Sequence, residues 1–318
     1  MGTLFTITLY ARDKTNAQIA ARAAFQRISD LDDLMSDYQA DSELMRLCDQ
    51  PSCTPVQVSA DLFQVLEKAQ HFSRLSEGAF DVTVGPYVRL WRFARKKKIL
   101  PTTGELRSAA DSVGFEKLRL DGKKRTATLL VPGMRLDLGG IAKGYAADQA
   151  LKSLQEQGIR RALVAASGDI AFGDPPPGQP GWSAGITTID ERSNRASRSI
   201  FLSHAGISTS GDTEQFVEID SVRYSHIVDP HSGMGLTNRI QATVVARDAT
   251  TTDALATALC VLGVKRSLAL VDSIPDAAAL ILTREGEQIR AFPSRRFGAF
   301  TEALGNRKSH STPQPTSP

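Results

Sequence analysis

The hydrophobic and polar positions along the chain predict helices and strands in blocks rather than in strict alternation. Apolar residues at helical spacing predict amphipathic helices over residues 15–35 and 59–76, with a short helix over 42–47. Period-two alternation predicts a strand over 3–10. Residues 78–93 mix glycine, proline and aromatic residues, which predicts packed but irregular structure.

The rest of the chain is richer in strands. Residues 135–158 predict a strand, a glycine turn and a helix that ends at Gly158. Two helices are predicted over 251–262 and 264–272. Further strands are predicted over 117–121, 126–131, 161–166, 182–188, 198–203, 215–219, 222–228, 240–246, 278–283 and 287–292. This order, without an internal repeat, favours an α+β fold with mostly antiparallel strands over a doubly wound sheet.

The domain organisation follows from length and composition. A chain of 318 residues is compatible with one compact body of two lobes, which we place over residues 1–304. Residues 305–318 lack apolar anchors and are predicted to be a disordered tail. No apolar run approaches the roughly 18 residues of a membrane span, and the start lacks the features of a signal peptide. As written, the chain is expected in the cytoplasm; a removed or upstream leader would make it periplasmic or membrane-anchored.

Charge and cysteine content limit the ligands and partners to be expected. With 38 basic and 35 acidic residues the net charge is only +3, so nucleic acid is not expected as a partner. The basic run 95–98 is expected to be a solvated loop. Cys48, Cys53 and Cys260 do not form a metal set and are expected to be mostly free thiols, although Cys48 and Cys53 could bridge a short loop.

The first candidate for chemistry is the stretch LDLGGIAKGYAAD over residues 136–148. Glycines between a strand and a helix let backbone N–H groups approach a ligand, and a helix N-terminus favours phosphate. Lys143 in the first turn could meet a phosphate or a carboxylate. The spacing is neither the dinucleotide fingerprint nor a Walker A loop. A simple glycine-assisted turn therefore remains an alternative.

The second candidate is TTTDALATALCVLG over residues 250–263. Asp253 and Thr257 are four residues apart, so a helix places both side chains on one face. Their oxygens are hard ligands that suit magnesium. The alternative is that one of the threonines at 250–252 caps the helix, that Asp253 complements the helix dipole, and that Thr257 bonds to the preceding turn.

The third candidate is His226 in the stretch YSHIVDPHSG. It lies in a predicted strand, three residues before Asp229, and follows the Ser/Thr/Asp-rich segment GISTSGDTEQF. Pro230 ends the strand. A histidine beside such a segment is a candidate general base, and a structural histidine in the strand is the alternative.

Taken together and in order, these stretches resemble the ApbE family of FAD:protein FMN transferases. The resemblance runs from Met1 to about Gly263. The pieces that carry it are MGTLFTITLY, MSDYQADSEL, GAFDVTVGPYVRLW, LDLGGIAKGYAAD, ISTSGDTEQF, YSHIVDPHSG and TTDALATAL. Each piece is weak alone, but seven in sequence make a specific match.

The resemblance implies a two-lobed α+β fold with FAD in the cleft and magnesium at its diphosphate. The residues it implies for FAD binding are Met1, Tyr38, Ala79, Phe80, Asp81, Asp137, Lys143 and Val228. The residues it implies for the metal are Gly140 and Ala256, through their carbonyl oxygens, and Asp253 and Thr257, through their side chains. His226, in the motif H-x-x-D-P, would be the base.

The implied reaction is the magnesium-dependent transfer of FMN from FAD to a serine or threonine hydroxyl of an acceptor flavoprotein, with release of AMP. If water replaces the hydroxyl, the same site is an FAD pyrophosphatase. A non-catalytic flavin-binding carrier is the alternative of another class, and the presence of His226 and Asp253 disfavours it. A redox flavoenzyme is not expected, because the chain has no nicotinamide dinucleotide fingerprint and no Cys-x-x-Cys motif.

The chain departs from the family pattern in two places that bear on the site. Thr252 stands where a small residue usually precedes the metal aspartate, and it could add an oxygen near the metal. Ala166 and Ser167 replace the first glycines of a GGD turn, which leaves Gly168 and Asp169.

Overall fold

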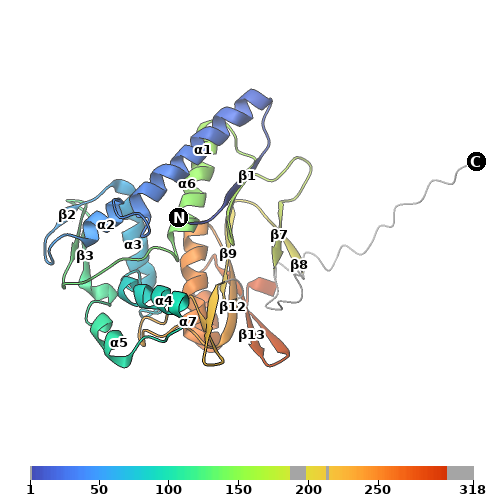
Figure 1. Cartoon of the computed structure of the whole chain (residues 1–318). Coiled ribbons are helices and arrows are strands. Elements are labelled where there is room, and N and C mark those ends of the chain that lie inside the picture. Colours follow the sequence, from blue (N-terminus) through green and yellow to red (C-terminus); the bar gives the residue numbers. More distant parts are fainter. Residues whose placement is uncertain (1, 187–197, 213–214, 299–318) are drawn as a thin grey trace, which may run out of the picture.

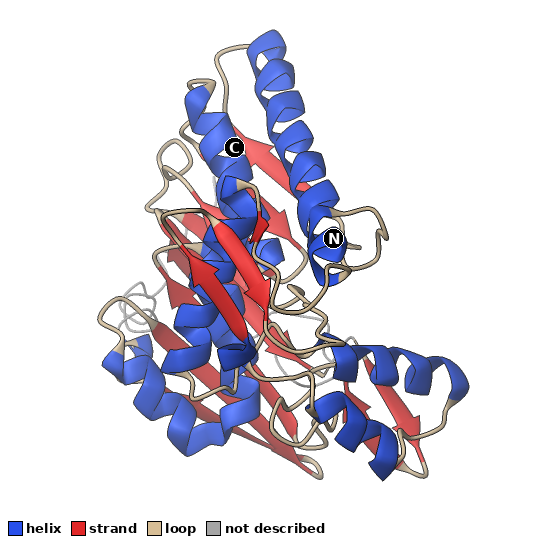
Figure 2. Ribbon diagram, turned by 90° about the vertical axis from the view of Figure 1, so that its left-hand side faces the viewer, coloured by secondary structure: helices blue, strands red, loops and turns tan. Residues whose placement is uncertain are grey.

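The computed structural model describes residues 2–186, 198–212 and 215–298 and has an α+β architecture. Helices lie over the strands of one large sheet, and a group of helices with small sheets forms a second lobe (Figures 1 and 2). The predicted fold class is therefore confirmed. Met1, the end of the predicted strand 182–188 and the predicted tail 305–318 lie outside the described residues.

The large sheet has seven strands, and every neighbouring pair is antiparallel. In sheet order the strands are β1 (Phe5–Leu9), β5 (Ala162–Ala166), β6 (Asp169–Phe172), β9 (Ala205–Gly211), β12 (Arg239–Ala246), β13 (Ala278–Glu285) and β14 (Gln288–Pro293). The interior strand β12 is buried almost without interruption because both faces of the sheet are covered.

Two helices cover one face of this sheet and a hairpin covers part of the other. The helices are α6 (Ala142–Glu156) and α7 (Ala249–Ser273), and the hairpin joins β7 (Trp182–Ile186) to β8 (Arg198–Leu202). The two helices approach closely at Gly144, where an added Cβ would lie only 2.1 Å from the carbonyl oxygen of Ala249. A glycine is required at this crossing, and it brings the first turns of the two helices together.

The second lobe consists of helices and small sheets. Its helices are α1 (Lys14–Met35), α2 (Glu43–Cys48), α3 (Ala60–Leu75), α4 (Gly85–Lys97), α5 (Thr103–Ala110) and the 3₁₀ turn η1 (Phe115–Lys117). Its strands are β2 (Val56–Gln57), β3 (Leu118–Asp121) and β4 (Thr126–Leu129). The separate hairpin of β10 (Phe216–Ile219) and β11 (Val222–Ser225) packs against α4 through an aromatic contact between Trp91 and Tyr224. Unlike the other helices of this lobe, α1 also packs along α6 of the sheet layer.

The structure corrects several sequence predictions. Residues 78–93 are not irregular throughout, since α4 begins at Gly85; Pro86 in its first turn is compatible with a helix start, and Trp91 supplies a buried face. The basic residues 95–97 form the last turn of α4 rather than a loop. The strand predicted before the glycine turn is reduced to a single bridge between Val84 and Arg135. β6, β9 and α5 were not predicted.

The α7 helix joins the two helices that were predicted over 251–262 and 264–272. It is broken at Gly263, whose φ of 71° is not helical. Its N-cap is Asp248, which accepts a hydrogen bond from the backbone N–H of Thr251, so none of the threonines at 250–252 is the cap. By length and composition α7 could cross a membrane, the one such helix in the described ranges, but it packs on β9 and β12 in the core. Its apolar composition is thus explained by burial.

The cysteines behave as expected for free thiols. Cys48 and Cys260 are buried and Cys53 is exposed, and none of the three is in a disulfide. The alternative of a Cys48–Cys53 bridge is therefore not observed. Burial raises the pKa of Cys48 to about 11, so this thiol stays protonated and unreactive at neutral pH.

Candidate active site

A cleft of about 660 Å³ lies where the two lobes meet, and most of the predicted site residues line it. The predicted residues that line it are Tyr38, Ala79, Phe80, Asp81, Asp137, Gly140, Lys143, His226, Val228, Asp253 and Thr257. Ala256 is fully buried on α7 and does not line the cleft, so its role as a carbonyl ligand stays a prediction. The tertiary structure thus gathers side chains that are up to 219 positions apart, from Tyr38 to Thr257, in one cavity.

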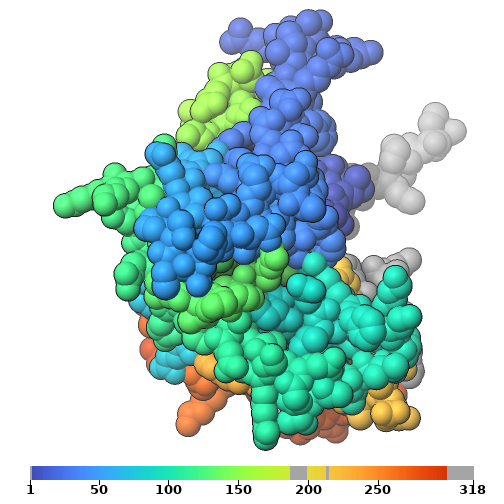
Figure 3. All heavy atoms as spheres, turned by 60° about the vertical axis from the view of Figure 1, so that its left-hand side comes forward, coloured from blue at the N-terminus to red at the C-terminus, as the bar shows by residue number. Residues whose placement is uncertain are grey.

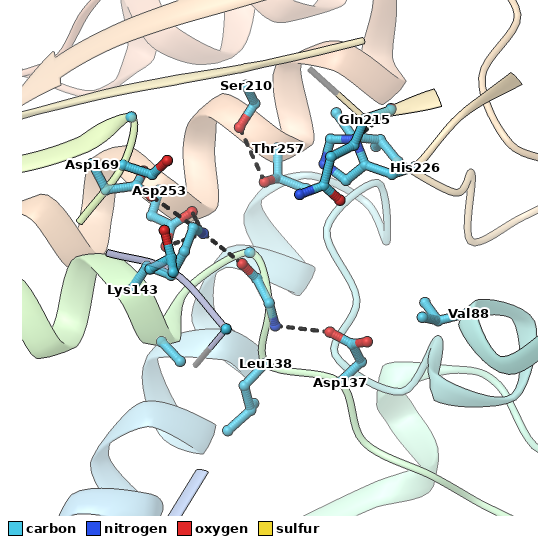
Figure 4. Close-up of a pocket in the computed structure, with 18 of the residues that line it drawn as sticks. Val88, Asp137, Leu138, Lys143, Asp169, Ser210, Gln215, His226, Asp253 and Thr257 are labelled. Atoms are coloured by element: carbon cyan, nitrogen blue, oxygen red, sulfur yellow. Dashed lines mark hydrogen bonds and ion pairs between the residues drawn. The ribbon is translucent and has the colours of Figure 1, made fainter. Parts of the chain in front are cut away.

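Lys143 is the centre of a charged cluster at one end of the cleft. Its Nζ lies 3.2 Å from both carboxylate oxygens of Asp253 and 3.2 Å from Asp169 Oδ2, and it donates to the carbonyl oxygen of Gly139 at 2.7 Å (Figure 4). The backbone N–H of Gly144 donates to Asp253 at 3.0 Å. One cation therefore faces two nearly buried carboxylates, which leaves the cluster with an excess of negative charge when both are ionised.

Burial and charge set the protonation of this cluster. Burial raises the pKa of Asp253 to about 7, with a further contribution from the neighbouring Asp169 charge, while Lys143 opposes both. Burial lowers the pKa of Lys143, but the two carboxylates outweigh it and keep that pKa above its ordinary value. Lys143 is therefore a permanent cation, whereas the charge on Asp253 is costly without a further cation.

The residues around Asp253 fit a magnesium ion by chemistry. Thr257 lies one turn further along α7, and its hydroxyl is 3.4 Å from that of Ser210. A Cβ on Gly140 would be 3.0 Å from Thr257 Oγ1, so the backbone at Gly140 lies directly against this side chain. Carboxylate, hydroxyl and carbonyl oxygens are the ligands that magnesium prefers, and the excess negative charge of the cluster would be neutralised by a divalent cation.

Thr252 does not join these oxygen ligands. Its hydroxyl lies 2.7 Å from that of Ser208 and donates to the carbonyl oxygen of Ala249 at 3.1 Å. The side chain is fully buried between α7 and β9 and does not line the cleft. The expectation that Thr252 could add an oxygen near the metal is therefore not supported.

His226 lies across the cleft from the lysine cluster, with Thr257 between them in the view of Figure 4. It follows β11 rather than lying in a strand, which corrects the sequence prediction. Its Nδ1 is 3.0 Å from the carbonyl oxygen of Gln215, and its backbone N–H donates to the same oxygen. Because a carbonyl oxygen only accepts, Nδ1 carries the proton in the neutral ring, and Nε2 is left with the lone pair that a base needs.

The electrostatic surroundings favour this neutral form. Burial lowers the pKa of His226, and the positive charges of Arg95 and Lys143 lower it further. The Gln215 carbonyl and Asp137 act in the opposite direction but do not reverse the shift. At neutral pH His226 is therefore an unprotonated acceptor.

Arg92 organises the side of the cleft that carries Tyr38. Its Nη2 lies 2.5 Å from Asp37 Oδ2 and 3.2 Å from Asp137 Oδ2, and its guanidinium carbon is 4.2 Å from the centre of the Tyr38 ring. Burial and the nearby Asp137 raise the pKa of Asp37 to about 6. One guanidinium thus holds two carboxylates together and supports an aromatic ring that is 70% exposed.

The remaining predicted residues build the wall of the cleft. Asp81 is almost buried, and its Oδ1 accepts hydrogen bonds from the backbone N–H and the hydroxyl of Thr83, both at 2.7 Å. Burial nevertheless raises the pKa of Asp81. Phe80 packs edge to face on Phe72 and also contacts the position of Gly140. Asp81 therefore fixes the turn that follows Phe80 in the wall of the cavity.

The position of Asp253 depends on a cap supplied by another helix. Asp148 on α6 accepts hydrogen bonds from the backbone N–H groups of Ala249 and Thr250, at 2.9 and 2.8 Å, and from the Thr250 hydroxyl. These bonds satisfy free donors at the start of α7. Together with the close approach at Gly144, they fix the first turn of α7 against α6, so that Asp253 meets Lys143.

Sequence reasoning missed four polar residues that shape the site: Asp37, Arg92, Asp169 and Gln215. Asp169 had a sequence signal, because it ends the remnant of the GGD turn that the resemblance identified. Arg92 lay in a segment for which no helix was predicted, so its inward direction could not be inferred. Gln215 acts through its backbone carbonyl, which carries no sequence signal at all.

The fold and the cleft define a two-lobed α+β protein whose cavity brings together a lysine, two buried carboxylates and a histidine with a free acceptor nitrogen. A family model described as the ApbE family matches residues 1–281. The chain therefore belongs to the ApbE family.

Relatives and solved structures agree with this assignment. A protein of Vibrio cholerae named FAD:protein FMN transferase is 35% identical over 281 residues, which cover 86% of this chain and 82% of that protein. A Salmonella typhimurium protein of the same name is 31% identical, covering 94% of this chain and 87% of the relative. The structure of the Vibrio cholerae flavin transferase ApbE superposes with a TM-score of 0.84 at 32% identity, covering 94% of this chain and 96% of the other.

Proposed function

We propose that this protein transfers FMN from FAD to a serine or threonine hydroxyl of an acceptor flavoprotein, with magnesium as the metal and AMP as the leaving product. The observation that carries the proposal is the pairing of two sites in one cleft: a histidine with a fixed acceptor nitrogen faces a cluster of Lys143 and oxygen ligands. The names of the relatives support flavin transfer as the reaction.

The chain's own residues supply the proton transfer. The acceptor hydroxyl has too high a pKa to attack unaided, so His226 Nε2 would take its proton as the oxygen attacks the phosphorus of the FMN half. A phosphoester bond forms, the bond between the two phosphates breaks, and AMP leaves with the bonding electron pair. Because Nδ1 already donates to Gln215, the ring is held in the tautomer that this step requires.

Lys143 and the oxygen ligands would stabilise the charge that develops on the phosphates. The ammonium group, held by Asp169 and Asp253, provides a fixed positive charge at the cleft. Asp253, Thr257 and the Gly140 carbonyl would hold magnesium, which would neutralise charge at the diphosphate. The exposed ring of Tyr38, supported by Arg92, would stack on a ring of the dinucleotide.

The test is incubation of the full chain with FAD, magnesium chloride and a purified candidate acceptor flavoprotein, followed by intact mass measurement. We expect the acceptor to gain the mass of one FMN group by phosphoester formation, and AMP to appear in equal amount. Release of free FMN and AMP without any mass gain, over a panel of acceptors, would identify an FAD pyrophosphatase instead. Tight FAD binding without consumption would identify a carrier.

A further inference from the structure

The outer side of α4 carries a basic surface with exposed apolar side chains, which we call the α4 basic surface. Arg89, Phe93 and Lys96 are spaced four and three residues apart, so they share one helix face. Lys97 is the last residue of the helix, and Lys98 and Ile99 continue this surface past its end. Phe93 is 58% exposed and Ile99 is 62% exposed. Figure 3 shows this part of the chain in teal, at the lower right of the molecule.

The folding of α4 does not account for this surface. The packing face of the helix is already used, since Tyr87 and Trp91 are buried against the β10–β11 hairpin and Trp91 donates to the carbonyl oxygen of Gly233 at 2.8 Å. Cations in the last turn complement the helix dipole. That effect does not explain Arg89 in the middle of the helix, nor two large apolar side chains exposed to water.

The cations of the surface form no ion pair in the ranges that the structure describes. The described ion pairs include none with Arg89, Lys96, Lys97 or Lys98. Arg92, on the same helix, is the contrast, because its guanidinium contacts two carboxylates. A partner that covered the α4 basic surface would therefore need to bring negative charge of its own.

This surface borders the place where the acceptor hydroxyl must arrive. The neighbouring face of α4 lines the cleft through Val84, Val88, Arg92 and Arg95. Arg95 is near enough to His226 for its charge to act on the imidazole. A protein whose hydroxyl reaches His226 must have the rest of its body over the rim of the cleft, and α4 forms part of that rim.

We propose that the α4 basic surface binds an acidic segment of the acceptor flavoprotein, with Phe93 and Ile99 as apolar anchors. This inference rests on the proposed function and names the surface that selects its protein substrate. An anionic membrane would match the charge as well. A protein partner is favoured because a flat bilayer seated on α4 would obstruct access to the adjoining cleft.

The test compares a variant of the surface with a matched control. The surface variant is Phe93→Ser with Lys96→Glu and Lys97→Glu, all exposed and outside the cleft lining. The control is Lys123→Glu with Lys124→Glu, which reverses two adjacent exposed lysines in the turn between β3 and β4. The probe is an apo-flavoprotein that the parent flavinylates as judged by intact mass, and each chain is also assayed for FAD affinity and for FAD hydrolysis without acceptor.

We expect the surface variant to lose at least about tenfold in kcat/KM for the acceptor protein, mostly through KM, with FAD affinity and acceptor-free hydrolysis unchanged. The control should match the parent in every assay, and the difference between parent and variant should shrink as salt is added. Normal flavinylation by the surface variant would overturn the inference. Binding of each protein to phosphatidylglycerol vesicles is measured as well. A surface variant that loses vesicle binding but flavinylates normally would assign the surface to lipid and would also overturn the inference. If the parent flavinylates no acceptor, the proposed function fails, and this inference fails with it.

Discussion

His226 Nδ1 lies 3.0 Å from the carbonyl oxygen of Gln215, and this contact decides what the histidine can do. A backbone carbonyl cannot donate, so the neutral ring must place its proton on Nδ1 and leave Nε2 as the acceptor. The acceptor nitrogen is thus set by the main chain of a neighbouring loop rather than by an acidic side chain.

The first prediction concerns His226 as the base. His226→Gln should retain FAD binding and the melting temperature of the parent, and should slow FMN transfer by roughly 10²- to 10⁴-fold, the usual contribution of a positioned base. Single-turnover transfer and thermal unfolding measured on one preparation separate a catalytic from a packing role. A variant that is unstable but fully active per folded molecule would contradict the assignment.

The pH dependence of the parent gives a second readout of the same residue. Because burial and the charges of Arg95 and Lys143 lower the pKa of His226, the base form is already present at mildly acidic pH. The transfer rate should rise with pH through a midpoint below 6.5, and this rise should be absent in His226→Gln. A parent midpoint clearly above 6.5 would be inconsistent with the described surroundings.

The second prediction concerns Arg92. Arg92→Met keeps an unbranched aliphatic stem but leaves Asp37 and Asp137 without their shared cation and Tyr38 without its support. We expect the Kd for FAD, measured by flavin fluorescence, to rise about tenfold or more, since a partly buried pair is lost together with a stacking platform. Adding Asp37→Asn should recover part of the loss by removing one of the two unpaired charges. Unchanged FAD affinity in Arg92→Met would exclude this role.

The third prediction concerns the metal. Asp253 is the one negatively charged side chain among the predicted ligands. Asp253→Asn should therefore lose activity, and added magnesium chloride should not restore it. The same variant should lose the increase in melting temperature that magnesium chloride gives the parent in the presence of FAD. The melting temperature of each protein without ligands serves as the control. Undiminished turnover by the parent in excess EDTA would rule out a metal at this site.

The fourth prediction concerns Asp148, which caps α7 from α6. Burial, with a contribution from the Asp248 charge, raises the pKa of Asp148 to about 6, above the ordinary value of 3.8. A raised pKa in the folded state means that protonation stabilises the fold, so this contribution is complete below pH 3.8 and is lost as the pH rises through 6.

Asp148→Asn should therefore become less destabilising relative to the parent as the pH rises from about 4 to 7. The expected change is on the order of 1–3 kcal/mol in the difference between the two free energies of unfolding. Urea denaturation of both proteins at several pH values measures it. The hydrogen bonds that asparagine cannot accept add an offset that does not depend on pH. A difference that is constant over this range would show that Asp148 does not titrate near 6.

The fifth prediction concerns the turn between β5 and β6. Ser167 has a φ of +59°, a left-handed conformation that disfavours residues with a side chain. It stands where the family pattern has glycine, and it is the first residue of a two-residue hairpin loop. Ser167→Gly should raise the free energy of unfolding by about 1 kcal/mol in urea. Destabilisation by this change would mean that the serine side chain makes a contact that outweighs the strain.

Much of the fold follows from the sequence, because local periodicity determines which residues can share a buried face. The amphipathic helix over 15–35 and the helix that ends before Gly158 both form where the pattern places them. The hydrophobic pattern did not predict β6 and β9, two interior strands of the large sheet. Five of the seven residues of β9 are Ser, Thr or Gly, and the strand carries no alternation, yet it pairs with β6 and β12 in the centre of the sheet. Only the pairing of distant strands supplies its hydrogen bonds.

The candidate site, like the fold, was predictable from the sequence only in part. The sequence by itself determined the residue types at the motifs, including Lys143, Asp253 and His226, because these are local and occur in a fixed order. The tertiary structure decided how they act. Gly144 allows two helices to touch so that Lys143 meets Asp253, and a main-chain oxygen of Gln215 selects the tautomer of His226. Such contacts join residues that are distant along the chain, through backbone geometry that no side-chain pattern encodes.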